Sequence, residues 1–388
     1  MRQNPDYILK NLQNTPYLLP VAQSFAEHKR SLKLNATGVY IWQLLEQSPS
    51  LEDLLFCCAR HYQVMEEDSD RLKQDVLSFL SYLASADALL DFEPKEDILS
   101  RGFEIAGIFI RISAPAAYFP KELAPFASSF QESPDLKITI HRNFFPDARK
   151  GTLLLHTPEL CVMDCDSEYL LLFPSLSSLS EIRLKKDGSE AEVSCKDSCK
   201  ASSNTAEAVS SEEIFPALRT VFLYLAQKKG KIALHSSSIL FEGKAWLFSA
   251  PSGTGKSTQA ALWNQYMGAD ILNGDLNLLG LENGIPILYG IPWCGTSGIS
   301  STKRVPLGGI FFLKQAARDK IEFLSGDKKR LYFCHRLISP VWTSEQGERS
   351  LSLVDALADK LLLCRLYATR ERSAVDAVRA VLDTPAAP

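Results

Sequence analysis

The chain has 388 residues, 46% of them hydrophobic, which is enough for about two or three domains with sizeable cores. Its formal net charge of −4 provides no broad basic surface, so we expect no nucleic-acid partner. No apolar run approaches the ~18 residues of a membrane span, and the first residues lack the apolar core of a signal peptide. We therefore expect a cytoplasmic protein that has no membrane partner.

The nine cysteines are an odd number, which favours reduced thiols over a disulfide framework. Cys161 and Cys165 form one C-x3-C pair, and Cys195 and Cys199 form a second. Zinc sites usually have a two-residue spacing, so free thiols are the favoured interpretation. Metal binding by these pairs stays open.

Residues 1–95 show the pattern of a small winged-helix module. Short alternating segments predict three strands, the first two on either side of the Asn14-Thr15-Pro16 turn. Three helices follow, of which the second begins at Ser50 with Asp53 in capping-box position. The apolar stripe of the third helix, with its 3.6-residue spacing, consists of Leu72, Val76, Phe79, Leu80 and Leu83.

Residues 34–45, Leu-Asn-Ala-Thr-Gly-Val-Tyr-Ile-Trp-Gln-Leu-Leu, carry a family resemblance. Together with the spacing to 51–54 and the helix ending at Leu83, they resemble the PqqD-like family of peptide-leader-binding elements. The resemblance implies that the leader of a precursor peptide adds a strand beside the third strand and packs on the third helix. A DNA-binding winged helix or a dimerisation block are the alternatives, and the acidic residues around 66–70 disfavour DNA.

A polar break at 93–97 is the first expected domain boundary. Residues 100–212 then predict an antiparallel β-rich region without a catalytic cluster. The polar, Ser-rich stretch 188–211 has the composition of a loop. The strands of this region are expected at 103–112, 137–140, 152–155, 169–172 and 181–184.

Residues 213–388 predict an α/β domain built around a nucleotide site. Residues 244–258 combine an apolar run, a loop of small residues and Gly-Lys-Ser-Thr, and a helix-compatible segment follows. This order predicts the strand, phosphate loop and helix of a P-loop, although Ala250 stands where the pattern opens with Gly. Loop N–H groups and the helix start would bind phosphate oxygens. The expected nucleotide-binding residues are Ser252, Gly253, Thr254, Gly255, Lys256, Ser257 and Thr258.

Within this site Lys256 would reach the β- and γ-phosphates of ATP, and Ser257 would hold Mg²⁺. A carboxylate is needed nearby to help bind the metal or to take the proton of the acceptor hydroxyl. Asp275 follows an apolar strand at the right distance along the chain, and we expect it to be this carboxylate, with a turn acid as the alternative. Asp270 precedes that strand and is expected in a turn.

The order of His235, the P-loop and Asn273-Gly274-Asp275 resembles the HPr kinase/phosphorylase family. In that family a histidine ends the strand pair before the loop, and two adjacent acids follow the loop. The resemblance implies that His235 tunes the acid or touches a phosphate, while a structural histidine is the alternative. This chain has Gly274 in place of one acid, which leaves the reverse, phosphorylase reaction in doubt.

The stretch 289–298, with Pro-Trp-Cys-Gly-Thr at its centre, suits a loop that borders the phosphates. Short relatives of the kinase family carry a similar run. Cys294 has no evident histidine partner in the sequence, so we expect an inert thiol. Lys303 and Arg304 follow as candidates for offsetting phosphoryl charge, with a solvated pair as the alternative.

The fold expected is an α/β HPr-kinase-like P-loop domain, preceded by a β-rich region and an N-terminal winged-helix PqqD-like domain. We expect an ATP- and Mg²⁺-dependent kinase for a serine or threonine hydroxyl of a ribosomally made peptide, recruited through its leader. Three alternatives stay open: a kinase for another protein or small-molecule hydroxyl, a non-catalytic nucleotide-gated leader-binding module, and an NTPase. The acceptor residue and the nucleotide preference stay open, and a homo-oligomer is compatible with the resemblance.

Overall fold

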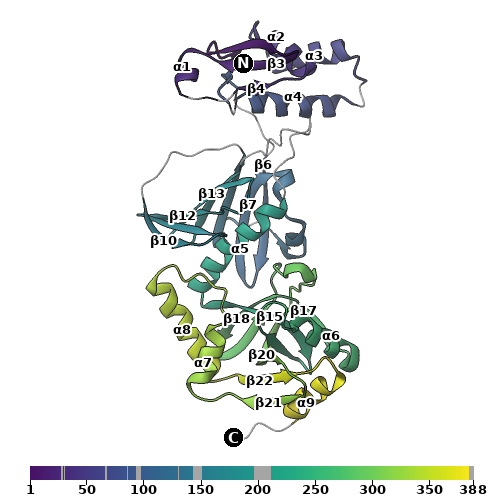
Figure 1. Ribbon diagram of the computed structural model, residues 1–388, viewed down its shortest axis with the longest axis vertical. Helices are drawn as coiled ribbons and strands as arrows, with labels where there is room; N and C mark the ends of the chain where they lie inside the picture. The colour runs from purple at the N-terminus through teal and green to yellow at the C-terminus, as the bar shows by residue number, and fades with distance from the viewer. Residues whose placement is uncertain are drawn as a thin grey trace. The chain divides into compact units, whose positions relative to one another are not determined.

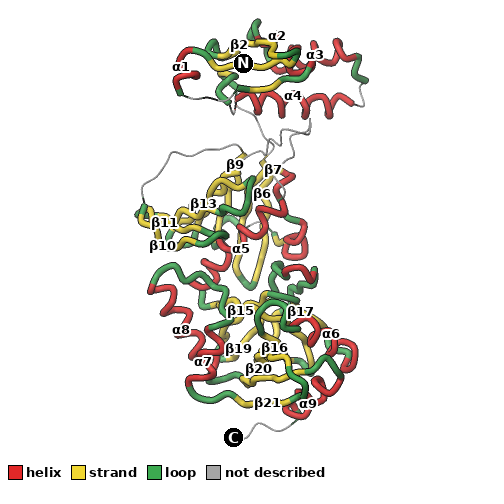
Figure 2. Tube along the Cα trace, viewed as in Figure 1, coloured by secondary structure: helices red, strands yellow, loops and turns green. Residues whose placement is uncertain are grey.

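The computed structural model describes residues 1–27, 29, 31–65, 68–84, 86–92, 98–129, 131–142, 151–195 and 211–383. The chain divides into two compact units, Met1–Asp97 and Ile98–Pro388 (Figures 1 and 2). The polar break expected at 93–97 lies outside the described residues, next to this division. The β-rich and P-loop regions, which the sequence patterns separate at 212/213, share the second unit.

The first unit contains a three-stranded antiparallel sheet in the order β2-β3-β4. Asn35 caps α2 by accepting a hydrogen bond from the Gly38 N–H at 2.7 Å, and Ser50 and Asp53 form the expected capping box of α3. The elements are β1 (Arg2–Gln3), β2 (Tyr7–Leu12), β3 (Thr15–Pro20), α1 (Ala22–Ala26), β4 (Leu32–Lys33), α2 (Ala36–Leu45), α3 (Leu51–Tyr62), α4 (Ser69–Ala84) and β5 (Leu89–Leu90).

The core of the first unit is formed by the apolar faces of α2, α3 and α4 against the sheet. Ile41 and Trp42 of α2 are buried with Leu54 of α3, and Leu80 and Leu83 of α4 are fully buried. The apolar stripe predicted for the third helix is therefore its core-facing side.

The second unit begins with a nine-stranded sheet in the order β10-β11-β12-β13-β14-β9-β7-β6-β8. The expectation of an antiparallel sheet is wrong at β9, which runs parallel to both β7 and β14. The chain leaves β7 through short 3₁₀ helices and β8 before it returns as β9, and such a crossover makes the two strands parallel. The strands are β6 (Ile98–Ile105), β7 (Ile108–Pro115), β8 (Ala127–Ser128), β9 (Leu136–Arg142), β10 (Thr152–His156), β11 (Cys161–Cys165), β12 (Glu168–Leu172), β13 (Leu179–Lys185) and β14 (Glu190–Cys195).

Two further expectations for this sheet are corrected. The single strand expected at 103–112 is a hairpin, because Ala106 and Gly107 adopt positive φ values of 56° and 73° and turn the chain between β6 and β7. The Ser-rich stretch 188–211 contains β14, whose Ala191 and Val193 are buried in the sheet. Residues 196–210 lie outside the described residues.

The P-loop region is a second sheet in which β16 pairs with both β15 and β20, so that β15, β18, β19, β20 and β16 form a closed ring. Within the described residues, no helix has the length and apolar content to cross a membrane. The elements are β15 (Lys231–Phe241), β16 (Lys244–Ser249), α6 (Lys256–Met267), β17 (Asp270–Asn273), β18 (Leu276–Glu282), β19 (Ile285–Tyr289), β20 (Arg304–Gln315), β21 (Lys320–Phe323), α7 (Asp327–Cys334), α8 (Ser344–Ala358), β22 (Leu362–Ala368) and α9 (Arg372–Leu382).

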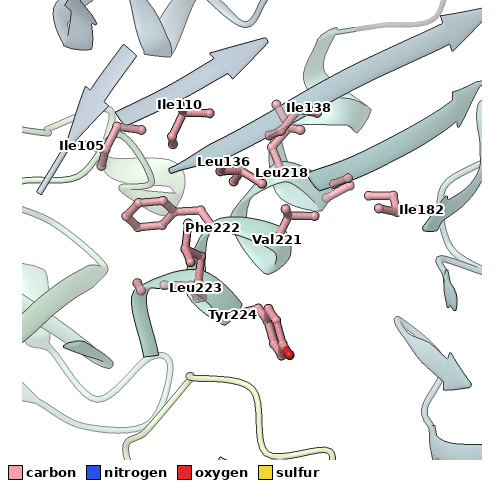
Figure 3. Packing of buried hydrophobic residues seen from close by; sticks show 14 of the residues in the cluster. Ile105, Ile110, Leu136, Ile138, Ile182, Leu218, Val221, Phe222, Leu223 and Tyr224 are labelled. Carbon is pink, nitrogen blue, oxygen red and sulfur yellow. The ribbon is translucent and has the colours of Figure 1, made fainter. Parts of the chain in front are cut away.

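One helix, α5 (Ser211–Lys228), joins the two sheets of the second unit into one core. Figure 3 shows Leu218, Val221 and Phe222 of α5 beside apolar side chains of the nine-stranded sheet. The same core includes Ala233 of β15 and Leu278 of β18. The helix is therefore packed on one side by the nine-stranded sheet and on another by the ring of strands.

The strand that carries His235 does not end at this residue, contrary to what the family resemblance implies. It continues as β15 to Phe241 and changes partner on the way: His235 pairs with Leu276 of β18, and Ser236 pairs with Ser249 of β16. The correction has a physical reason: Ser236, Ser237 and Ser238 are all buried, and their small hydroxyl groups donate to the Leu234 carbonyl, the Lys256 carbonyl at the start of α6 and the Asn277 side chain.

A short segment after α7 adds to β15 and fixes the backbone of His235. The His235 N–H donates to the Arg336 carbonyl at 2.9 Å, and the Ile338 N–H donates to the Ala233 carbonyl at 2.9 Å. The Ala233 N–H donates to the Ser339 hydroxyl oxygen at 2.8 Å. A side-chain hydroxyl thus provides the acceptor at the end of this short pairing.

We expect Ser339→Ala to lower the free energy of unfolding by about 1–3 kcal/mol, because the buried Ala233 N–H would lose its acceptor. Urea unfolding of the full chain measures the change. Ser325→Ala removes an exposed hydroxyl from the same unit and serves as the matched control, expected within about 0.5 kcal/mol of the unaltered chain. Equal stability of the two variants would contradict the proposed importance of this contact.

Candidate functional site

The strand, loop and helix expected at 244–258 are β16, residues 250–255 and α6. Gly253 and Gly255 have φ values of +77° and +110°, which non-glycine residues rarely adopt. Gly255 is the N-cap of α6 and no side chain caps the helix, so its first N–H groups are free of a side-chain acceptor. Ala250 is 1% exposed, so the methyl group that replaces the first glycine of the pattern is packed in the core.

The loop has room for a bound group beside it. A Cβ atom built on Gly253 would meet no atom within 4 Å, and one on Gly255 would meet only Thr258 at 4.0 Å. Ser257 is exposed at the start of α6, and the described residues provide no hydrogen bond to its hydroxyl. Open glycine backbone, uncapped helix N–H groups and a free hydroxyl are the donor set that a magnesium–polyphosphate complex requires.

His235, Lys256 and Asp275 meet at one atom. The His235 Nε2 lies 3.0 Å from Asp275 Oδ1 and 2.9 Å from Lys256 Nζ. The three come from different elements: His235 from the point where β15 changes partner, Lys256 from the first turn of α6, and Asp275 from the turn between β17 and β18. All three residues expected to be catalytic from the sequence are therefore brought together.

The two contacts of the imidazole nitrogen require different protonation states. When Nε2 carries a proton, it donates a hydrogen bond to Asp275. When Nε2 carries none, it accepts one from the Lys256 ammonium, which also donates to the Ala250 carbonyl at 3.4 Å. An anion that draws Lys256 toward itself would therefore favour the first state and strengthen the bond to Asp275.

Charges and burial shift the pKa values of two of these groups in the same direction. The hydrogen bond from His235 lowers the pKa of Asp275, and the charges of His235, Lys256 and Arg219 lower it further, while burial opposes the shift. Burial lowers the pKa of Lys256, opposed by the Asp275 charge and reinforced by Arg336. Asp275 is thus held ionised at neutral pH, and the Lys256 ammonium lies where an anionic ligand would stabilise it.

Asn273 holds the turn that carries Asp275, a role that the sequence did not reveal. Its Oδ1 accepts hydrogen bonds from the N–H groups of Asp275 at 3.0 Å and Leu276 at 3.1 Å. Its Nδ2 donates to the carbonyls of Ile291 at 3.3 Å and Trp293 at 3.2 Å. One buried amide therefore connects the carboxylate turn to the Pro-Trp-Cys-Gly-Thr loop.

That loop fills the space beside Gly274. A Cβ atom on Gly274 would lie 2.1 Å from Ser297 Oγ, which itself donates to the Cys294 carbonyl at 2.7 Å. A Cβ atom on Gly295 would lie 2.8 Å from Asp275 Oδ2. The loop thus packs directly on the carboxylate turn. Gly274, which stands where the kinase family has one of its two acids, has no room for a side chain.

The other candidates lie apart from this cluster. Lys303 forms an ion pair with Asp270 at 3.2 Å, and Arg304 donates to Glu282 at 2.7 Å, so both cations have carboxylate partners elsewhere. Burial raises the pKa of the Cys294 thiol, in keeping with the inert thiol expected from the sequence.

The cysteine pairs give no metal centre within the described residues, where no group of three or more His, Cys, Asp or Glu side chains gathers. Cys161, Cys165 and Cys195 are buried. Cys199 lies outside the described residues, so metal binding by the second pair stays a hypothesis.

Two arginines near the site were missed from the sequence. The Arg219 charge acts on Asp275, and the Arg336 charge acts on Lys256. Arg219 lies on α5 and Arg336 lies in the turn after α7, both outside the sequence motifs that predicted the site. Arg219 follows Phe215 by four positions and precedes Phe222 by three, and this spacing places all three residues on one side of a helix. A charged residue between two aromatic residues on one helix face could have indicated a functional role.

The first unit matches a known family: residues 25–89 match PqqD, described as coenzyme PQQ synthesis protein D. No curated protein matches the chain. The chain is similar to a solved structure described as TbiB1 in complex with the TbiA(beta) leader peptide, with 22% identity, 24% of this chain and 99% of that chain covered, and a TM-score of 0.21. It is also similar to the Hpr(Ser) kinase/phosphatase from Coxiella burnetii, with 11% identity, 39% of this chain and 95% of that chain covered, and a TM-score of 0.24.

The PqqD match confirms the resemblance predicted for the N-terminal residues. The second structure is of the kinase class that the sequence of the P-loop region resembles.

The packing between Gly274 and Ser297 yields a test. We expect Gly274→Ala to lower the free energy of unfolding by about 1–3 kcal/mol, because the added methyl group overlaps Ser297. Ser297→Gly frees that space, so the double variant should lose less than the sum of the two single losses. Urea unfolding measures all three variants.

Gly347→Ala is the matched control, since a Cβ atom at this position in α8 meets nothing within 4 Å. We expect this change to be neutral or slightly stabilising. Strictly additive losses for Gly274→Ala and Ser297→Gly would show that the two residues do not compete for space.

Proposed function

We propose that the protein is an ATP-dependent kinase that phosphorylates a serine or threonine hydroxyl of a ribosomally made peptide, which is recruited through its leader. The observation that supports it most directly is the convergence of Lys256 and Asp275 on one nitrogen of His235, beside a glycine loop with open space. A phosphate-binding lysine and an ionised carboxylate at the same point are what phosphoryl transfer to an alcohol requires.

In this proposal, residues 252–258 bind the triphosphate through backbone N–H groups and Lys256. Ser257 and Asp275 hold Mg²⁺, which when bound neutralises charge on the phosphate oxygens. Asp275 orients the acceptor hydroxyl. Its oxygen forms a bond to the γ-phosphorus while the bond from that phosphorus to the β-phosphate oxygen breaks, the hydroxyl proton passes to Asp275, and ADP leaves.

His235 is a positioning residue in this scheme. When phosphate draws Lys256 away, the imidazole Nε2–H donates a hydrogen bond to Asp275 and keeps the carboxylate in one orientation. The lowered pKa of Asp275 suits an ionised group that binds a cation and accepts a hydrogen bond from an alcohol.

The first unit supplies the peptide in this proposal. Its β2-β3-β4 sheet and helices α2–α4 would act as a winged-helix module, and within the described residues β4 pairs only with β3. The leader would add a strand at the free edge of β4, with side-chain pockets providing selectivity. Binding of the leader raises the effective concentration of the acceptor segment at Asp275. We place this reaction in the cytoplasm.

We expect Asp275→Asn to reduce phosphate transfer by about 10²–10⁴-fold while binding of ATP without Mg²⁺ changes by less than about threefold, because the change removes the proton acceptor and a metal ligand but leaves the loop intact. Lys256→Ala should weaken ATP binding itself. Asp270→Asn is the matched control, since Asp270 lies in a surface ion pair with Lys303. Mass spectrometry of a leader-bearing peptide incubated with ATP and Mg²⁺ measures transfer, and isothermal titration measures binding.

The alternatives give different results in the same assays. Full transfer by Asp275→Asn would remove the catalytic role of the carboxylate. ADP release at full rate without peptide would indicate an NTPase, and phosphate on another protein or a small molecule, but on no peptide, would indicate a different kinase.

The free edge of β4 gives a test of leader binding. The Leu34 N–H donates to the Pro16 carbonyl of β3 at 2.9 Å, and since N–H groups alternate along a strand, the Lys33 N–H faces the free edge. We expect Lys33→Pro, which lacks that N–H, to raise the KM for the peptide by about tenfold or more with kcat unchanged. Lys33→Ala keeps the N–H and should behave like the unaltered chain. Steady-state kinetics with the full peptide decides, and equal KM values for the two variants would exclude this edge as the docking site.

A further inference from the structure

Arg219 lies on the side of α5 that faces the Pro-Trp-Cys-Gly-Thr loop. Phe215 and Phe222, one turn before and after it, pack on Trp293 with ring centroids 5.5 Å and 5.0 Å away. The Trp293 indole N–H donates to the Phe215 carbonyl at 2.9 Å. Residues four and three positions apart share one side of a helix, so Arg219 is placed between these two contacts.

The same loop reaches the carboxylate. Gly295, two residues after Trp293, packs so closely on Asp275 that an added Cβ atom would lie 2.8 Å from Asp275 Oδ2. The loop contact thus places the Arg219 side of α5 next to the catalytic turn. In agreement, Asp275 opposes the effect of burial on the Arg219 pKa, and the Arg219 charge lowers the pKa of Asp275.

Among the described residues, the Arg219 guanidinium has no hydrogen-bonded or ion-paired partner. Burial lowers its pKa, which means that its surroundings disfavour the charge. Arg183, another poorly exposed arginine, instead donates to Glu181 at 2.7 Å. A desolvated guanidinium without a partner is costly, and such groups are found where an anion binds.

We propose that Arg219 is a catalytic arginine that α5 supplies within the same chain, and that its guanidinium donates hydrogen bonds to the oxygens of the phosphoryl group during transfer. This inference rests on the proposed kinase function and adds to it a residue outside the P-loop and the carboxylate turn. The planar fork of N–H donors matches phosphoryl oxygens, and it binds most strongly when charge builds up on them.

The balance of the reaction is unchanged by this role. The acceptor oxygen still forms its bond to phosphorus, the bond to the β-phosphate oxygen breaks, and the proton goes to Asp275. Arg219 exchanges no proton and no covalent bond. The two cations would then approach from different elements, α5 and α6.

The test compares Arg219→Ala, Arg219→Met and Arg219→Lys with the unaltered full chain. Arg219→Met removes the guanidinium but keeps an unbranched apolar side chain of similar length, so it preserves the packing of the arginine stem. The role of the charge can therefore be tested even if Arg219→Ala fails to fold. Arg318→Ala removes an exposed arginine of the same unit and is the matched control. Transfer to a leader-bearing peptide is measured at saturating ATP, together with ATP affinity and with binding of ADP, Mg²⁺ and aluminium fluoride as a mimic of the transferring phosphoryl group.

We expect kcat to fall by about 10²–10³-fold in the alanine and methionine variants while ATP affinity and peptide KM change by less than about threefold. Tight binding of the aluminium fluoride complex should be lost, and added guanidinium chloride should restore part of the rate to Arg219→Ala. A kcat within about threefold of the unaltered chain, or undiminished binding of the aluminium fluoride complex, would overturn the proposal.

Failure of the proposed function is distinguishable from failure of this inference. If the unaltered chain transfers no phosphate to peptide but hydrolyses ATP, the peptide-kinase function fails, and the same variants are compared by ATP hydrolysis. If neither reaction occurs, the binding of the aluminium fluoride complex still separates Arg219→Met from Arg318→Ala. Equal binding by these two variants overturns the role of Arg219 in either case.

Discussion

The Nε2 atom of His235 can either accept a hydrogen bond from the Lys256 ammonium or donate one to the Asp275 carboxylate, but it cannot do both at once. The surrounding structure keeps both of these groups within hydrogen-bond distance of this atom. The backbone of His235 is fixed by the segment after α7, and Lys256 is fixed by the helix start. Asp275 is fixed by the amide of Asn273. Opposite charges therefore stay within reach of each other without forming a direct, permanent pair, and an incoming anion can redistribute them.

The sequence predicted best what depends on neighbouring residues. The glycine loop, the helix of residues 256–267 and the capping box at Ser50 are set by residues within a few positions of one another, and each is present as expected. The stripe of α4 follows in the same way from helical periodicity.

The sequence could not predict what depends on distant partners. The parallel pairing of β9 depends on which strands meet after a crossover, and periodicity does not encode this. The continuation of β15 past His235 depends on hydroxyl partners in β18 and α6 that lie far along the chain. Arg219 is separated from Asp275 by more than fifty positions, so only the packing of α5 on Trp293 brings them near.

The packing of α5 between two sheets also has a consequence for engineering. A region without catalytic side chains, the nine-stranded sheet, nevertheless sets the angle at which α5 presents its charged residue, because Leu218 and Val221 are locked into that sheet. A small tilt of a helix is magnified at the tip of a long side chain. A chimaera in which another scaffold replaced this sheet would have to reproduce the apolar surface that packs against α5, even if every residue around the glycine loop were retained.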